Sequence, residues 1–189
     1  MSENMEPMQE TSKEKYSFKL EVYDWMQCIV VALVACILIF TFVGRIIGVD
    51  GGSMLPTLED GDKIIITSLY GKLEYGDIVV LTKREFSREP IVKRVIATEG
   101  QTVDINFKTG EVWVDDILLD EPYINAPTTR QLDMKFPVTI PEGCIFVMGD
   151  NRNKSTDSRA STIGFVDTRC VLGKAVNIIW PISRFGDMK

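Results

Sequence analysis

An uncharged run from Trp25 to Gly44 constrains this chain more than any other feature of its sequence. About 20 mainly apolar residues in an α-helix span the ~30 Å hydrocarbon layer of a bilayer. Asp24 and Arg45 bracket the run, and Trp25 stands where an interfacial aromatic side chain is expected. We therefore expect residues 25–47 to form a single transmembrane anchor.

The same run has two other interpretations, a buried core helix and a cleaved signal peptide. Its apolar side chains would cover every face of a helix, whereas the helices of soluble domains are more often amphipathic. The acid-rich tail of residues 1–24 is longer than a typical signal-peptide leader, which favours a retained anchor. Lys13, Lys15 and Lys19 precede the run, so the positive-inside rule weakly favours a cytoplasmic N-terminus and an extracytoplasmic remainder. Residues 1–24 show no apolar periodicity, which predicts a disordered tail.

Residues 48–189 show a different pattern, in which short β-branched runs alternate with Gly and Asp turns. We expect strands over residues 63–67, 77–81, 91–97, 102–107, 111–119, 145–148 and 171–179. Such spacing predicts a mainly β fold, an antiparallel coiled-sheet or barrel-like domain that follows the single N-terminal transmembrane α-helix. Residues 121–141 are rich in proline and are typical of a long surface connection, within a small β insertion around residues 100–141.

Charge and the supply of catalytic side chains narrow the chemistry. The net charge of the 189 residues is −6, which argues against a nucleic-acid partner. The sequence has no histidine, which removes the Ser-His-Asp triad, the Cys-His pair and histidine-based zinc sites and leaves lysine as the usual substitute base. Cys28 and Cys36 lie in the apolar run. Cys144 and Cys170 lie in the later domain and could pair if it faces an oxidising compartment, since a disulfide depends on a Cα distance that the sequence does not give.

Two segments carry a candidate nucleophile and a candidate base. In Gly51-Gly-Ser-Met-Leu-Pro56, two glycines let the backbone turn sharply beside Ser53, although a linker serine in a flexible hinge would look the same. In residues 91–97, alternation puts Lys93 on one strand face and Arg94 on the other, so one cation points toward whichever face is buried. A lysine among apolar neighbours loses its proton more readily, whereas an edge-strand lysine that discourages aggregation is the plainer alternative.

A third segment, the loop of residues 149–159, is dense in short polar side chains that bond the backbone and one another. Asp157 with Arg159, or Asp150 with Arg152, would form ion pairs that lock this loop. A calcium loop is the alternative, but the Asp-x-Asp-x-Asp-Gly spacing and the terminal Glu are missing, so we expect no metal here.

Together the three segments resemble the type I signal peptidases, the serine-lysine leader peptidases, in their Gram-positive-like bacterial form. The resemblance covers nearly the whole chain and rests on motifs in a fixed order after the anchor. They are Gly51-Gly-Ser-Met-Leu-Pro-Thr-Leu58, Gly76-Asp-Ile-Val-Val80, Val92-Lys-Arg-Val-Ile-Ala97 with Glu99-Gly100, and Val147-Met-Gly-Asp-Asn-Arg152 with Ser155, Asp157, Ser158 and Arg159.

The resemblance implies a membrane-bound serine endopeptidase that removes N-terminal signal peptides from exported preproteins after a small-x-small motif such as Ala-x-Ala. Its implied partners are secretory preproteins and membrane lipid, with no cofactor and no nucleic acid. The backbone N–H of the nucleophile would donate to the oxyanion. The implied site residues are Ser53 as nucleophile, Lys93 as neutral buried base, Ser155 as the serine that orients this lysine, Asp157 and Arg159 as a bracing pair, and Met54 and Val92 along the substrate cleft.

The chain departs from the family pattern in its oxyanion hole and in the shape of one loop, but not in the serine-lysine pair. Some members carry a serine where this chain has Gly51, so the side-chain part of their oxyanion hole is missing here. The segment from Arg159 to Gly164 is longer than usual, and the short connection from Lys93 to the last motif suggests a reduced second subdomain.

Three other functions are the alternatives: a self-cleaving DNA-binding regulator, a non-catalytic membrane-anchored binding module and a structural lipid-surface protein. The anchor argues against the first, the joint presence of the implied catalytic residues against the second, and the polar loop against the third.

Overall fold

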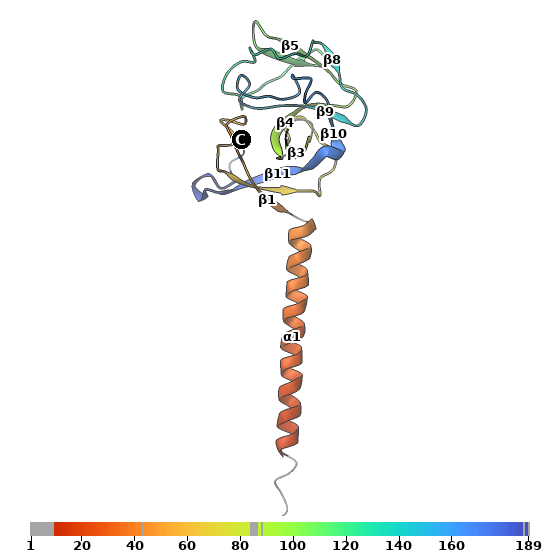
Figure 1. Ribbon diagram of the computed structural model, residues 1–189, viewed down its shortest axis with the longest axis vertical. Coiled ribbons are helices and arrows are strands. Elements are labelled where there is room, and N and C mark those ends of the chain that lie inside the picture. Colours follow the sequence, from red (N-terminus) through yellow and green to blue (C-terminus); the bar gives the residue numbers. More distant parts are fainter. Residues whose placement is uncertain (1–9, 43, 84–86, 88, 187, 189) are drawn as a thin grey trace, which may run out of the picture. The chain divides into compact units, whose positions relative to one another are not determined.

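The computed structural model describes residues 10–42, 44–83, 87, 89–186 and 188, and the chain divides into two compact units that meet in sequence between Thr41 and Phe42 (Figure 1). The described part of the N-terminal unit belongs to the helix α1, Glu10–Phe42, whose last residue falls in the second unit. Its segment Phe18–Leu38 has a mean hydropathy of 1.7, and none of it is buried. The helix is long and apolar enough to cross a membrane.

Helix α1 begins well before the predicted anchor, so the described part of the expected disordered tail is helical. Glu and Lys, which dominate residues 10–19, are good helix formers, and extending an existing helix is easier than starting a new one. At the other end, residues 45–47 were expected in the anchor but belong to a strand, β1, Arg45–Gly48. This strand pairs antiparallel with the next one, from Arg45 opposite Ile66 to Gly48 opposite Lys63.

The main sheet of the β unit has seven strands in the order β1-β2-β11-β3-β4-β9-β10, and its pairs are antiparallel. The strands after β1 are β2 Lys63–Thr67, β3 Ile78–Leu81, β4 Ile91–Thr98, β9 Cys144–Met148, β10 Val166–Asp167 and β11 Val171–Trp180. Irregular registers interrupt β11 against both of its neighbours and β4 against β9, and such bulges bend a sheet. The prediction of a mainly β, coiled antiparallel domain after one N-terminal helix is therefore confirmed.

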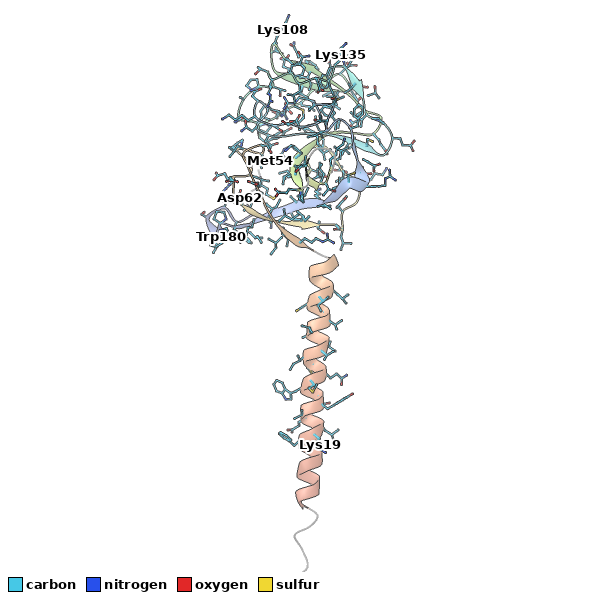
Figure 2. All side chains as sticks on the ribbon, in the orientation of Figure 1. Lys19, Met54, Asp62, Lys108, Lys135 and Trp180 are labelled. Atoms are coloured by element: carbon cyan, nitrogen blue, oxygen red, sulfur yellow. The ribbon has the colours of Figure 1, made fainter. Side chains whose placement is uncertain are left out.

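A second sheet has the order β7-β6-β5-β8 and lies in the segment where a β insertion was expected. Its strands are β5 Thr102–Asn106, β6 Glu111–Val114, β7 Ile117–Leu118 and β8 Val138–Thr139. The single strand predicted over residues 111–119 is instead a hairpin, because Asp115 and Asp116 adopt φ of 50° and 63° and turn the chain. Figure 2 labels Lys108 and Lys135 at this end of the β unit and Met54 and Asp62 at the other.

Strand β4 lies at the centre of the hydrophobic core. Its Val92 packs with Met54 and other side chains of one cluster, Val95 packs in a second cluster, and Ile96 packs in a third. Residues 92–97 are all buried, so both faces of the strand are covered. Two 3₁₀ turns, Thr168–Cys170 and Ile182–Arg184, flank β11.

Candidate active site

Ser53 lies in the loop between β1 and β2, and hydrogen bonds hold the backbone of this loop on both sides of Ser53. The Leu58 N–H donates to the Met54 carbonyl at 2.9 Å, and both side chains are buried in the core. Gly51 has φ of +80°, which favours glycine, and its N–H donates to the Asp60 carboxylate at 2.8 Å. The loop therefore presents a half-buried Ser53 on a fixed backbone.

Lys93 of β4 faces this serine across the fold. Its Nζ lies 2.9 Å from Ser53 Oγ and 2.9 Å from the Val92 carbonyl oxygen. The residue is only 4% exposed. Burial disfavours the ammonium and lowers the pKa of Lys93 to about 8, against the opposing pull of Asp157 and Asp150. A hydroxyl and an amine that is readily deprotonated are thus within hydrogen-bond reach.

A cleft of about 200 Å³ opens beside these two groups. The predicted cleft residues Met54 and Val92 both line it. The other lining residues include apolar side chains of the β1 segment and of the start of β4, namely Ile47, Val49, Pro90 and Ile91.

The loop of residues 149–159 is locked by buried ion pairs, one of which was predicted. Arg159 donates to both carboxylate oxygens of Asp157 at 2.8 Å, and both side chains are fully buried. Asp157 also accepts the Gly149 N–H at 3.0 Å. Arg159 further donates to the Arg152 carbonyl at 2.6 Å, so the pair holds the backbone at both ends of the loop.

The alternative pairing of Asp150 with Arg152 is wrong, because each side chain pairs with a distant residue. Asp150 accepts two hydrogen bonds from Arg94 at 2.8 and 2.7 Å, and both residues are buried. Arg152 instead forms a two-point pair with Glu121. Arg94 and Lys93 are consecutive and both buried, whereas alternation predicted that only one cation would face the core.

Ser155 is fully buried beside the nucleophile loop, but it does not form the expected hydrogen bond to Lys93. Among the described residues its Oγ has no hydrogen-bond partner. Gly149 separates it from the serine, because a Cβ at Gly149 would lie 2.3 Å from Ser155 Oγ and 2.5 Å from the Ser53 carbonyl oxygen. The Lys93 amine uses its contacts on Ser53 and Val92 instead. The sequence analysis did not predict that only glycine fits at position 149, although Gly149 lies inside the motif of residues 147–152.

The cysteines and the candidate metal ligands are the remaining residues considered in the sequence analysis. Cys144 and Cys170 are both free, as are Cys28 and Cys36 on α1. Within the described ranges, no group of three or more cysteine or acidic side chains is arranged to hold a metal ion.

Comparison with known proteins assigns the chain. The profile of the family described as signal peptidase, peptidase S26, matches residues 22–180. The chain belongs to this family. It is therefore a serine peptidase, a hydrolase, and the match spans the segments of Ser53, Lys93 and the 149–159 loop.

Curated relatives in the signal peptidase family align over most of their length. A probable signal peptidase I-1 of Synechocystis sp. (strain ATCC 27184 / PCC 6803 / Kazusa) is 33% identical over 85% of this chain and 83% of its own. Signal peptidase I of Bacillus licheniformis is 33% identical over 92% and 96%. A crystal structure of a signal peptidase I from Enterococcus faecalis V583 superposes with a TM-score of 0.47 and 29% identity, over 55% of this chain and 97% of that one.

Proposed function

We propose that this signal peptidase family member removes N-terminal signal peptides from exported preproteins, cleaving after a small-x-small motif such as Ala-x-Ala. The observation that carries the proposal is the 2.9 Å contact between Ser53 Oγ and the buried Nζ of Lys93. A serine hydroxyl is a weak nucleophile until a base lies within hydrogen-bond reach. Here the base is an amine whose charged form is disfavoured by burial.

The proposed reaction uses these two side chains in sequence. Ser53 Oγ attacks the scissile carbonyl carbon while Lys93 accepts the hydroxyl proton. The C–N bond breaks, the departing amine takes the proton from the Lys93 ammonium, and the mature protein leaves. Lys93 then takes a proton from water as the water oxygen attacks the carbonyl carbon of the ester on Ser53. The C–Oγ bond breaks, Ser53 Oγ takes the proton back from the Lys93 ammonium, and the signal peptide leaves with a free carboxyl terminus. The Ser53 N–H donates to the oxyanion in both steps.

The bracing residues support this scheme through charge as well as shape. Asp157 and Asp150 both raise the pKa of Lys93 against its burial, which limits how far it falls. Their own charges are balanced by Arg159 and Arg94, so neither aspartate leaves an unpaired buried charge beside the lysine. Asp157 and Arg159 thus hold the loop that packs against the nucleophile, with Ser155 beside it.

We further propose that α1 anchors the chain in the cell membrane by a single pass, with its N-terminus in the cytoplasm and the β unit on the extracytoplasmic face. The Phe18–Leu38 segment exposes its apolar side chains, as expected of a helix surrounded by the lipid of a bilayer. On the β unit, Trp180, Ile182 and Phe185 expose more than half of their surface, and Figure 2 shows Trp180 at its margin. Apolar groups of this kind favour contact with membrane lipid.

A cleavage assay tests the chemistry. Full-length enzyme in detergent or liposomes is incubated with a test preprotein that carries an Ala-x-Ala site, and the new N-terminus is identified by mass spectrometry. Ser53→Ala and Lys93→Ala should each abolish processing, whereas the matched controls Ser68→Ala and Lys63→Ala, which alter exposed side chains, should retain it. Near wild-type cleavage by either dyad variant contradicts the assignment.

A separate experiment tests the orientation. Protease added to intact spheroplasts should degrade a C-terminal tag and leave an N-terminal tag protected. The opposite pattern would overturn the proposed topology without affecting the chemistry.

A further inference from the structure

The backbone of the nucleophile loop is held by a residue outside the predicted set, Asn151. Its side-chain Nδ2 donates to the Gly52 carbonyl oxygen at 2.8 Å. Its backbone N–H donates to the Ser53 carbonyl oxygen at 3.0 Å. Asn151 is only 4% exposed, and its Oδ1 accepts a hydrogen bond from Asn125 at 3.3 Å, which orients the amide toward Gly52.

The Gly52 carbonyl oxygen also accepts the Leu55 N–H at 3.4 Å, and the bond from Asn151 is the shorter of the two. Together these bonds fix where the Ser53 N–H points. A trans peptide is planar, so the C=O of one residue and the N–H of the next point in opposite directions. With the Gly52 oxygen held against Asn151, the Ser53 N–H is directed away from that residue. Among the described residues this N–H makes no hydrogen bond, and Ser53 lines the cleft. A free donor on a fixed peptide plane is what an oxyanion requires.

We propose that Asn151 is a positioning residue that fixes the Gly52–Ser53 peptide plane and thereby aims the Ser53 N–H at the oxyanion of the reaction. The inference rests on the proposed function and deepens it. It matters more in this chain because Gly51 offers no side-chain hydroxyl as a second donor. Stabilisation of the oxyanion from this loop then depends on the orientation of the Ser53 backbone N–H.

A merely structural role for Asn151 is the competing explanation, and Asn153 provides its control. Asn153 lies in the same loop and also bonds backbone through its side chain. Its Nδ2 donates to the Pro127 carbonyl at 3.0 Å, and its Oδ1 accepts the Arg130 N–H at 2.9 Å. These contacts join the loop to residues 127–130 and not to the Ser53 loop. Replacing Asn153 therefore weakens the loop without releasing the Gly52–Ser53 peptide.

The experiment compares Asn151→Leu with Asn153→Leu, since leucine keeps the side-chain volume and removes the amide. Three properties are measured on the full chain: kcat and KM on an Ala-x-Ala preprotein, the pH midpoint of activity, and the affinity for two peptide probes. One probe is a peptide aldehyde, whose adduct with Ser53 places an oxygen in the oxyanion position. The other is the matching peptide alcohol, which has a hydroxyl in place of the reactive aldehyde carbonyl.

For Asn151→Leu we expect kcat to fall at least about tenfold while KM stays within about twofold of wild type. The loss of kcat should be smaller than that caused by removing an oxyanion donor, because the Ser53 N–H is still present. The affinity for the aldehyde should fall by a similar factor, whereas the affinity for the alcohol should not change, because the alcohol forms no oxyanion. The pH midpoint should not change either, because Lys93 is untouched. Asn153→Leu should keep kcat within about threefold. Where Asn151→Leu folds poorly, Asn125→Ala should show a smaller change in the same direction.

Two results overturn the inference. One is an Asn151 variant whose kcat stays within about threefold of wild type. The other is a parallel loss of aldehyde and alcohol affinity, which indicates a collapsed cleft. Failure of the proposed function looks different, since wild type would not cleave the preprotein or Ser53→Ala would cleave it as well.

Discussion

The proposed role of Lys93 as general base makes activity depend on pH, and the pKa of its buried amine sets the midpoint. Its pKa is lowered to about 8. At pH 7 about one-tenth of the enzyme then has the neutral amine, and at pH 9 about nine-tenths does. We expect kcat/KM to rise about tenfold from pH 7 to its alkaline plateau and to fall about tenfold for each pH unit below 7.

The assay is cleavage of a fluorogenic Ala-x-Ala peptide between pH 5 and 10 in detergent, with folding checked by circular dichroism at each pH. A single ionisation with a midpoint near 8 supports the lysine base. A rate that is flat between pH 6 and 9 refutes it, because no other group bonded to Ser53 Oγ among the described residues would supply the base.

The same pKa has a consequence for stability, whose sign follows from the protons bound in each state. The pKa of Lys93 falls from 10.5 to about 8 on folding, so between these values the unfolded chain binds the proton and the folded one does not. Stability therefore rises with pH across this window. Below it, both states are protonated and the folded state carries a penalty of about 3 kcal/mol.

Replacing the amine removes that penalty. Lys93→Met should be more stable than wild type in urea at pH 7, by up to about 3 kcal/mol, and the difference should shrink as pH rises above about 8 and vanish above the unfolded-state pKa of 10.5. The control Lys63→Met alters an exposed lysine and should stay within about 0.5 kcal/mol. Equal stability of Lys93→Met and wild type at pH 7 would show that the ammonium is not disfavoured by burial.

Two further variants test the support of the site. Gly149→Ala places a Cβ 2.5 Å from the Ser53 carbonyl oxygen, so it should lower kcat on a preprotein by at least about tenfold and lower the urea midpoint, whereas Gly71→Ala, which meets nothing within 4 Å, should change neither. Asp157→Asn removes one charge of a fully buried pair and should destabilise the chain by about 3–5 kcal/mol in urea; a loss below about 1 kcal/mol would mean that Arg159 finds another partner.

Much of the β unit could be predicted from local sequence pattern. The β-branched run of β2 was predicted with its observed bounds, Lys63–Thr67, because one alternating segment with turns on both sides carries its own signal. Strand β1 was missed because only Arg45 separates Ile46 and Ile47 from the apolar run, so these two residues look like its continuation. Only their partners on β2 determine that this segment is a strand. Strand β8 was missed because it is two residues long and follows Pro137.

The site divides along the same line between local and distant information. The pair of Asp157 with Arg159 is two residues apart, and a local pattern was enough to suggest it. Asp150 pairs with Arg94, which is 56 residues away, and Arg152 pairs with Glu121, which is 31 residues away. Sequence spacing alone favoured the nearer and wrong partner, because the packing of strands and loops that are distant in sequence decides which charges meet.

The burial of β4 links the fold to the proposed chemistry. A lysine on a half-exposed strand would keep its proton, since water would solvate the ammonium. Residues 92–97 are instead covered on both faces by packed clusters, and the 149–159 loop and the Ser53 loop are joined through Asn151. Lys93 is thereby held 2.9 Å from Ser53 Oγ in a site that disfavours its charge. The nucleophile is thus activated by tertiary packing, which explains why neither residue could be assigned from its own segment.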